Sequence, residues 1–317
     1  MAALQCRRLD ARFNLTRRSA VAKTRSAEIG NVKIGRYKVL TYSYGTGRDV
    51  LFLLNGGPGL PCDYLRDPLV ALVERGFRVV TYDQLGCGRS DKPKDKALWT
   101  IGRYVEEVDT VRKAMGLGRI HLLGHSWGGW LAIEYALKYQ KNLWSLVLSN
   151  TCGDMPHLIE ELNRHRAALG PETVAMMQRC EAENNFEHPA YMAAITILNY
   201  RHVLRLDVWP KSVNASLDDW NMDVYGTMQG PNEFLYTGNL KDWNRVPQMP
   251  RIRTPTLVLC GQHDELTPAC AMRMHHALPC SEITVFPNSS HLPMWEEPEI
   301  YLDRVARFLG MHRRIKT

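Results

Sequence analysis

The chain alternates short apolar runs with stretches in which apolar residues recur at helical spacing. The apolar runs predict strands at residues 50–54, 78–82, 120–123, 146–149, 256–260 and 283–286, after an antiparallel hairpin at 32–43. Helical spacing predicts helices at 63–75, 103–115 and 130–139. Thr267 before Pro268, and Glu297 before Pro298, predict two more helix starts. This alternation predicts an α/β fold with a mostly parallel sheet flanked by helices.

The alternation stops between residues 151 and 245. This stretch is rich in helix-forming and aromatic residues and contains no apolar run of the strand type. Its pattern predicts helices at 155–169, 171–184 and 189–206. A length of 317 residues suits one large α/β domain with an insertion. We therefore expect a helical cap at 151–245, inserted into a core formed by residues 31–150 and 246–317.

The net charge of +7 is concentrated at the amino terminus. Residues 1–30 contain seven basic and two acidic residues, and the rest of the chain is close to neutral. We expect residues 1–30 to be a basic, disordered extension, and we expect no nucleic-acid partner. No window approaches the roughly 18 apolar residues that a membrane span requires, so no membrane association is expected.

The eight cysteines are scattered along the chain. None forms a C-x-x-C pair, and no group of cysteine and histidine residues has zinc-binding spacing. Scattered thiols favour a reducing compartment, so we expect a cytoplasmic protein. The sequence implies neither a metal nor a cofactor.

Residues 124–128 read Gly-His-Ser-Trp-Gly, a G-x-S-x-G pattern with Ser126 at its centre. A predicted strand precedes the pattern and a predicted helix follows it, which is the setting of a nucleophile elbow. Glycines two residues before and after the serine relieve crowding where the serine backbone is strained. The alternative is a plain strand-to-helix turn, but this context predicts that Ser126 is a catalytic nucleophile.

A serine hydroxyl needs a base to remove its proton. Asp264 and His291 each follow a predicted strand, and the order Ser, Asp, His along the chain is that of α/β-hydrolases. His263 is the rival base, but it directly adjoins the acid and could not easily bind it and also reach Ser126. Glu265 and Asp303 are rival acids. The loop positions favour Asp264 as the orienting acid and His291 as the general base.

Residues 55–59, Asn-Gly-Gly-Pro-Gly, follow the predicted strand at 50–54. Glycines allow the backbone to approach a substrate closely. We expect one glycine N–H of this loop, together with the N–H of Trp127, to form an oxyanion hole. The alternative is a tight turn with no catalytic role.

From about residue 31 to residue 309 the chain resembles the proline iminopeptidases (prolyl aminopeptidases), a family of α/β-hydrolase serine peptidases. The motifs that carry the resemblance are residues 55–59, 83–90, the Ser126 elbow, 261–268 and 290–296. Asn55 departs from the family, which usually has histidine there, but the backbone donors survive that change. The resemblance implies that Gly57 is the oxyanion glycine. It also implies that Glu233, within 230–234, and Glu265 bind the substrate's free amine.

The resemblance predicts an aminopeptidase that releases an N-terminal residue, preferably proline, through an acyl-enzyme. Its partner would be a small peptide or amino-acid amide with a free N-terminus. Three alternatives remain open: an amidase acting on amino-acid amides or arylamides, a carboxylesterase or lactonase, and a non-catalytic binding protein on a hydrolase fold. Trp127, Phe234 and Tyr236 could form the wall of a proline pocket or pack in the core, and the sequence does not distinguish these possibilities.

Overall fold

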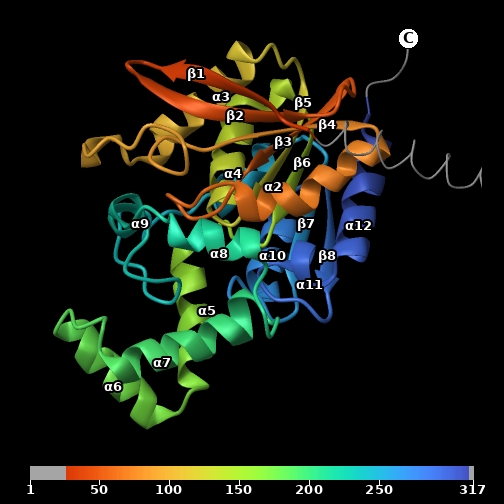
Figure 1. Cartoon of the computed structure of the whole chain (residues 1–317). Helices are drawn as coiled ribbons and strands as arrows, with labels where there is room; N and C mark the ends of the chain where they lie inside the picture. Colours follow the sequence, from red (N-terminus) through yellow and green to blue (C-terminus); the bar gives the residue numbers. More distant parts are fainter. Residues whose placement is uncertain (1–25, 314–317) are drawn as a thin grey trace, which may run out of the picture.

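The computed structural model describes residues 26–313 and has an eight-stranded sheet at its centre (Figure 1). The strand order is β1-β2-β4-β3-β5-β6-β7-β8. Strand β2 pairs antiparallel with both of its neighbours, and the remaining pairs are parallel. The strands are β1 (Glu28–Ile34), β2 (Tyr37–Tyr44), β3 (Asp49–Leu54), β4 (Phe77–Tyr82), β5 (Ile120–His125), β6 (Leu143–Ser149), β7 (Thr256–Gly261) and β8 (Ser281–Phe286). The predicted mostly parallel sheet is confirmed.

Each of the six apolar runs forms a strand. The inner parallel strands are buried on both faces and have near-continuous apolar sequences, whereas the edge strand β8 is only partly buried. Along β3, Leu51 and Leu53 join the apolar cluster on one face, and Phe52 and Leu54 join the cluster on the other. The opening hairpin is longer than predicted, since β1 begins at Glu28 and pairs that residue with Ser43. Its polar, exposed residues gave no apolar signal. Residues 1–25 of the predicted basic extension lie outside the described residues.

Helices cover both faces of the sheet (Figure 1). The apolar residues of α3, α4 and α10 join the cluster on one face, and those of α2 and α12 join the other. The helices are α2 (Asp63–Leu69), α3 (Ile101–Ala114), α4 (Trp127–Tyr139), α10 (Pro268–Ala277), α11 (Pro293–Glu296) and α12 (Pro298–Met311). The predicted helix at 63–75 is two elements, since a 3₁₀ helix (Val70–Arg75) continues α2. Both proline-marked helix starts are confirmed.

Five α-helices lie between β6 and β7: α5 (Met155–Ala167), α6 (Pro171–Ala182), α7 (Pro189–Leu198), α8 (Lys211–Asp218) and α9 (Met222–Met228). Figure 1 shows α6 and α7 farthest from the sheet, while α8 lies next to α2. The prediction that one helix spans 189–206 is wrong at its end. A π-helical turn, Asn199–Val203, follows α7 and leads into extended chain. There the His202 carbonyl accepts hydrogen bonds from the N–H groups of Glu265 and His291, so tertiary contacts determine the end of this helix.

Among residues 26–313, no helix is long and apolar enough to cross a membrane. The same part of the chain contains no group of three or more histidine, cysteine or acidic side chains arranged to hold a metal ion.

Candidate active site

Ser126 lies in a sharp turn between β5 and α4. Its backbone has φ 55° and ψ −124°, in a region that non-glycine residues rarely adopt. A Cβ on Gly124 would lie 2.1 Å from the Gly128 carbonyl oxygen, and one on Gly128 would lie 2.1 Å from that of Leu54. The two glycines of the pattern are therefore required by close backbone packing.

The strained turn is anchored on both sides. The Ser126 N–H donates to the Ser149 carbonyl at 3.1 Å. The Ser126 carbonyl accepts from the Thr151 hydroxyl at 2.8 Å and from the Gly129 N–H at 2.7 Å. The elbow is thus tied to the end of β6 and to the loop that follows it.

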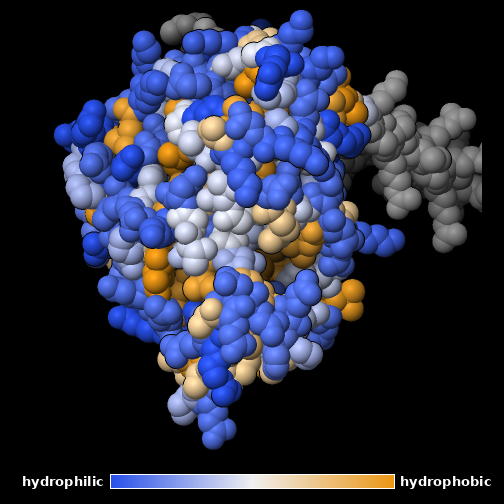
Figure 2. Space-filling model, turned by 90° about the vertical axis from the view of Figure 1, so that its left-hand side faces the viewer, coloured by the Kyte–Doolittle hydropathy of each residue, from blue (hydrophilic) through white to orange (hydrophobic). Residues whose placement is uncertain are grey.

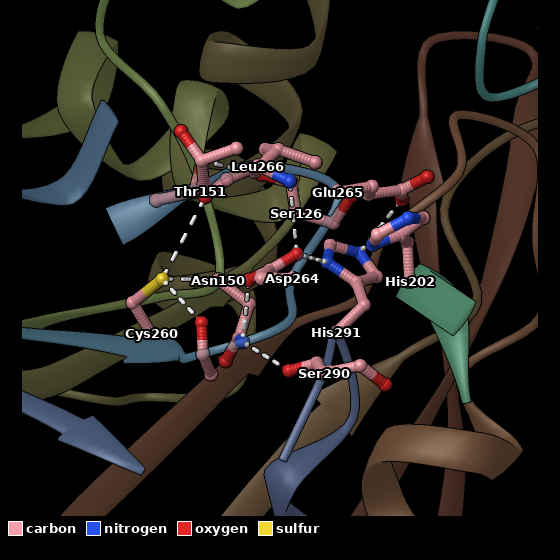
Figure 3. A network of polar contacts seen from close by, with 12 residues as sticks. Ser126, Asn150, Thr151, His202, Cys260, Asp264, Glu265, Leu266, Ser290 and His291 are labelled. Carbon is pink, nitrogen blue, oxygen red and sulfur yellow. Dashed lines mark hydrogen bonds and ion pairs between the residues drawn. The ribbon is translucent and has the colours of Figure 1, made fainter. Parts of the chain in front are cut away.

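Asp264 and His291 meet at the carboxyl ends of β7 and β8 (Figure 3). His291 Nδ1 lies 2.8 Å from Asp264 Oδ1, which also accepts from the Leu266 N–H at 2.9 Å. The other Asp264 oxygen accepts from Asn150 Nδ2 at 2.7 Å and lies 3.8 Å from Cys260 Sγ. Every oxygen of this fully buried carboxylate therefore has partners, and the side chain has one orientation.

Asn150 is a site residue that the sequence reasoning missed. It directly follows β6 with φ 51°, and its amide also donates to the Ser290 carbonyl at 3.1 Å. Asparagine tolerates this left-handed conformation better than most residues. An asparagine immediately after a predicted strand was the available signal.

The rival base His263 and one rival acid, Asp303, lie elsewhere, whereas the other rival acid, Glu265, lies near Nε2 of His291 and not at the Nδ1 that Asp264 contacts. His263 is not among the residues that line the pocket at Ser126, and its carbonyl accepts from His202 Nδ1. Asp303 lies on α12 and forms ion pairs with Arg75 and Arg307. Within the described chain, Ser126 and His291 line one pocket. Asp264 is not among its lining residues and contacts Nδ1 of His291.

Opposing effects act on the pKa of His291. Burial lowers it, but the carboxylates of Asp264 and Glu233 raise it, and the net shift is upward. Within residues 26–313 the Ser126 hydroxyl makes no hydrogen bond, and His291 Nε2 lies 3.6 Å from Glu265 Oε1. Catalytic hydrogen bonds are often long before substrate binds.

The loop after β3 approaches Ser126 closely. A Cβ on Gly56 would lie 3.0 Å from Ser126 Cβ, and Gly57 has φ 111° with no room for a side chain. Among residues 26–313, the N–H groups of Gly57 and Trp127 have no acceptor. These are the two donors that the sequence predicts for an oxyanion hole.

Asn55 and Gln84 hold this loop in place. Asn55 Nδ2 donates to the Leu60 carbonyl at 2.5 Å, and Gln84 Nε2 lies 3.3 Å from the Asn55 carbonyl oxygen. Gln84 Oε1 accepts from the Trp127 indole at 2.9 Å. Asn55 therefore has a structural role of its own in this loop, and Gln84 links the loop to the residue after Ser126.

Glu233 and Glu265 line the same pocket as Ser126 and His291. Glu265 is fully buried and Glu233 is half-buried, and burial raises the pKa of each carboxyl. Glu233 Oε2 accepts from Gln229 Nε2 at 2.6 Å. Among the described residues, neither oxygen of Glu265 has a hydrogen-bond partner. Buried carboxylate oxygens without donors are rare, and they indicate a site for a ligand with N–H or O–H groups.

The apolar wall of the pocket is not the one considered from the sequence. Trp127, Phe234 and Tyr236 are buried, and none of them is among the lining residues, so they pack in the core. The wall consists of Leu60, Val203, Trp209, Val213, Leu217 and Trp220. Most of these residues follow α7, in a stretch whose contacts the sequence pattern did not reveal. Figure 2 shows apolar side chains at the surface just above the protruding end of the molecule, which holds α6 and α7.

A family model described as alpha/beta hydrolase fold matches residues 49–298. Together with the sheet order and the strained serine elbow, this match defines the class of the protein as an α/β hydrolase. A proline iminopeptidase of Saccharolobus solfataricus is 40% identical over 267 residues, covering 84% of this chain and 86% of that protein. One of Flavobacterium johnsoniae is 35% identical over 282 residues, covering 87% and 95%. The chain belongs to the proline iminopeptidase family.

Solved structures agree with this assignment. The crystal structure of a proline iminopeptidase of Mycobacterium smegmatis has a TM-score of 0.83 and 35% identity, covering 90% of this chain and 98% of that one. The crystal structure of VinJ has a TM-score of 0.87 and 34% identity, covering 90% and 99%.

Proposed function

We propose that the protein is a serine aminopeptidase that releases an N-terminal residue, preferably proline, from small peptides or amino-acid amides. One observation carries the proposal: the carboxylates of Glu233 and Glu265, of which Glu265 is fully buried, share a pocket with Ser126 and His291. The names of the relatives, proline iminopeptidase, support the preference for proline.

The carboxylates would bind the substrate's terminal amine. A prolyl N-terminus is a cation with two N–H donors, and each glutamate can accept one. The positive charge would also offset the repulsion between the two carboxylates. Because Glu265 Oε1 lies 3.6 Å from His291 Nε2, an amine bound there sits close to the reacting groups. Only the first peptide bond of a substrate is then within reach of Ser126, which describes an exopeptidase.

The chemistry we propose is acyl transfer through Ser126. His291 Nε2 takes the hydroxyl proton while Ser126 Oγ attacks the scissile carbonyl carbon. The Asp264 carboxylate orients the imidazole and stabilises its cation, and the Gly57 and Trp127 N–H groups donate to the developing oxyanion. His291 then returns the proton to the leaving amine as the C–N bond breaks. Water, activated by His291, releases the amino acid and restores Ser126.

We propose that residues 151–245 act as a cap over this site. They supply Glu233 and most of the apolar wall, including Trp209 and Trp220. The wall would pack against the apolar parts of the substrate, whereas the glutamates fix its polar end.

The seven cysteines among the described residues are all free, which supports a cytoplasmic location.

The test compares four substrates: prolyl, alanyl and N-acetylprolyl arylamides and a simple acyl ester, with Ser126→Ala as the inactive control. The proposal expects the prolyl arylamide to be cleaved fastest, and acetylation of its nitrogen to abolish turnover. If the ester is cleaved best and blocking the amine changes nothing, the protein is an esterase and the aminopeptidase proposal is wrong.

A further inference from the structure

His125, directly before Ser126, makes two hydrogen bonds from a buried position at the end of β5. The residue is only 1% exposed. His125 Nδ1 lies 2.8 Å from the Tyr64 hydroxyl, and Nε2 lies 2.9 Å from the His291 carbonyl oxygen. Tyr64, on α2, also accepts from the Gly56 N–H at 2.6 Å. Three parts of the chain that are distant in the sequence, residues 56–64, His125 and His291, are therefore joined through two side chains.

The partners determine the direction of every hydrogen bond in this series. A carbonyl oxygen can only accept, so His125 Nε2 carries the hydrogen. Burial lowers the pKa of His125 well below its usual value, so the ring is neutral and Nδ1 accepts the Tyr64 proton. The Tyr64 oxygen in turn accepts from Gly56. The series therefore runs in one direction, from the Gly56 N–H to the His291 carbonyl, and hydrogen bonds aligned in this way strengthen one another.

The two ends of the series lie at the two halves of the proposed catalytic machinery. Gly56 directly precedes Gly57, and its own N–H is occupied by Tyr64, which leaves the Gly57 N–H for a substrate oxygen. The other end holds the backbone of His291, whose N–H also donates to the His202 carbonyl at 3.2 Å. The His125 and His291 rings lie 4.6 Å apart between centroids.

We propose that Tyr64 and His125 are positioning residues that hold the oxyanion-binding loop and the general base at a fixed separation. Their hydrogen bonds run to backbone groups and to each other, and not to the carboxylates of the amine site or to Asp264. Their effect is on the alignment of the Gly57 N–H, Ser126 and His291 Nε2, where a displacement of about 1 Å can cost 100-fold in rate. This proposal rests on the acyl-transfer part of the proposed function and is independent of the amine preference.

The first test is Tyr64→Phe, which keeps the ring and removes both hydrogen bonds. We expect kcat to fall roughly 10- to 100-fold, with KM changed less than about twofold, because neither hydrogen bond involves the substrate. The fall should be equal for the prolyl arylamide and the acyl ester. A kcat within twofold of wild type, or a loss confined to the arylamide, would overturn the proposal.

Tyr42→Phe is the matched control. Tyr42 is as deeply buried as Tyr64, and its hydroxyl donates to Asp83 Oδ2 at 2.9 Å, away from the pocket. This variant should lose stability and keep its kcat. An equal fall in kcat for both variants would mean that Tyr64 acts only through general stability, and the proposal would be wrong. If wild type shows no preference for a free amine, the comparison of Tyr64→Phe with Tyr42→Phe still stands, because kcat can be measured with the acyl ester.

A double variant tests whether the two side chains act as one series. Tyr64→Phe with His125→Phe should lose about as much kcat as the more impaired single variant, since breaking either link already interrupts the series. Multiplicative losses would show independent roles and contradict the proposal.

Nitrogen-15 NMR of the imidazole rings uses wild type alone, so this test does not depend on whether the variants fold. The titratable groups in contact with the His125 ring are Tyr64, from α2, and His291, from the loop after β8. The proposal requires His125 to stay neutral, with its hydrogen on Nε2, from pH 5 to pH 9. Either a hydrogen on Nδ1 or protonation within this range would overturn it.

Discussion

Asp264 and Glu265 are adjacent, fully buried carboxylates with opposite surroundings. The hydrogen-bonding capacity of the Asp264 carboxylate is saturated, because a histidine, an amide, a backbone N–H and a thiol contact its two oxygens. Within the described chain neither oxygen of Glu265 has a hydrogen-bond partner, and its one contact with a titratable donor is His291 Nε2, 3.6 Å from Oε1 (Figure 3). Burial of an unpaired carboxyl costs stability, and proteins accept such a cost most readily where a site binds a ligand.

This difference supports the proposal that the two carboxyls have separate tasks within one loop. A saturated carboxylate is held in one orientation before any substrate arrives, which suits a residue that orients a base. A carboxylate without hydrogen-bond donors lacks a partner, and the substrate can provide that donor. The proposed assignment of Asp264 to the triad and Glu265 to the amine site follows from this contrast.

The largest expected effect comes from Asp264→Asn. The amide cannot stabilise the imidazolium and favours the wrong tautomer of His291, so kcat should fall roughly 10⁴-fold. The loss should be the same for prolyl arylamide and acyl ester in steady-state assays. A loss restricted to the arylamide would instead place Asp264 in the amine site and remove the contrast.

Glu265→Gln should affect only substrates that carry a free amine. Loss of one charge-assisted hydrogen bond is worth about 1.5 to 3 kcal/mol, so kcat/KM for the prolyl arylamide should fall roughly 10- to 100-fold. Ester hydrolysis should stay within about twofold of wild type. Equal losses on both substrates would show that Glu265 supports the triad.

Glu233→Gln should shift the pH dependence of ester hydrolysis. The Glu233 carboxylate raises the pKa of His291, so removing its charge lowers that pKa. The base must be neutral to act, and the acid limb of kcat/KM should therefore move to lower pH. Rate profiles from pH 5 to 8 measure this limb. An unmoved limb would show that Glu233 does not influence the base.

The smallest effect is on stability. The pKa of Glu265 is raised in the folded state, so burying this group costs least when it is protonated, and the cost grows as pH rises above its pKa in the unfolded chain. Glu265→Met should therefore stabilise the protein by about 1 to 3 kcal/mol near pH 8 and by less near pH 5. Urea unfolding at both pH values measures the difference. A destabilisation of equal size at both would contradict this explanation.

The contrast also shows what the sequence can predict. The strands were predictable because apolar runs identify buried parallel strands, and the elbow because its glycines are required by backbone collisions. The π-helical turn at 199–203 was not predictable from the sequence. Its form depends on hydrogen bonds that the N–H groups of Glu265 and His291 donate to the His202 carbonyl. For the same reason the roles of Asn150 and Tyr64, and the apolar wall at Trp209 and Trp220, depend on contacts between distant segments.

The central claim is that the carboxylates of Glu233 and Glu265 bind a cationic amine. The most direct measurement is inhibition of ester hydrolysis by prolinol, a cation with no scissile bond, compared with N-acetylprolinol. The claim predicts competitive inhibition by prolinol, at least 10-fold weaker inhibition by its acetylated form (about 1.4 kcal/mol), and loss of this difference in Glu265→Gln. Equal inhibition by both compounds in wild type would contradict it.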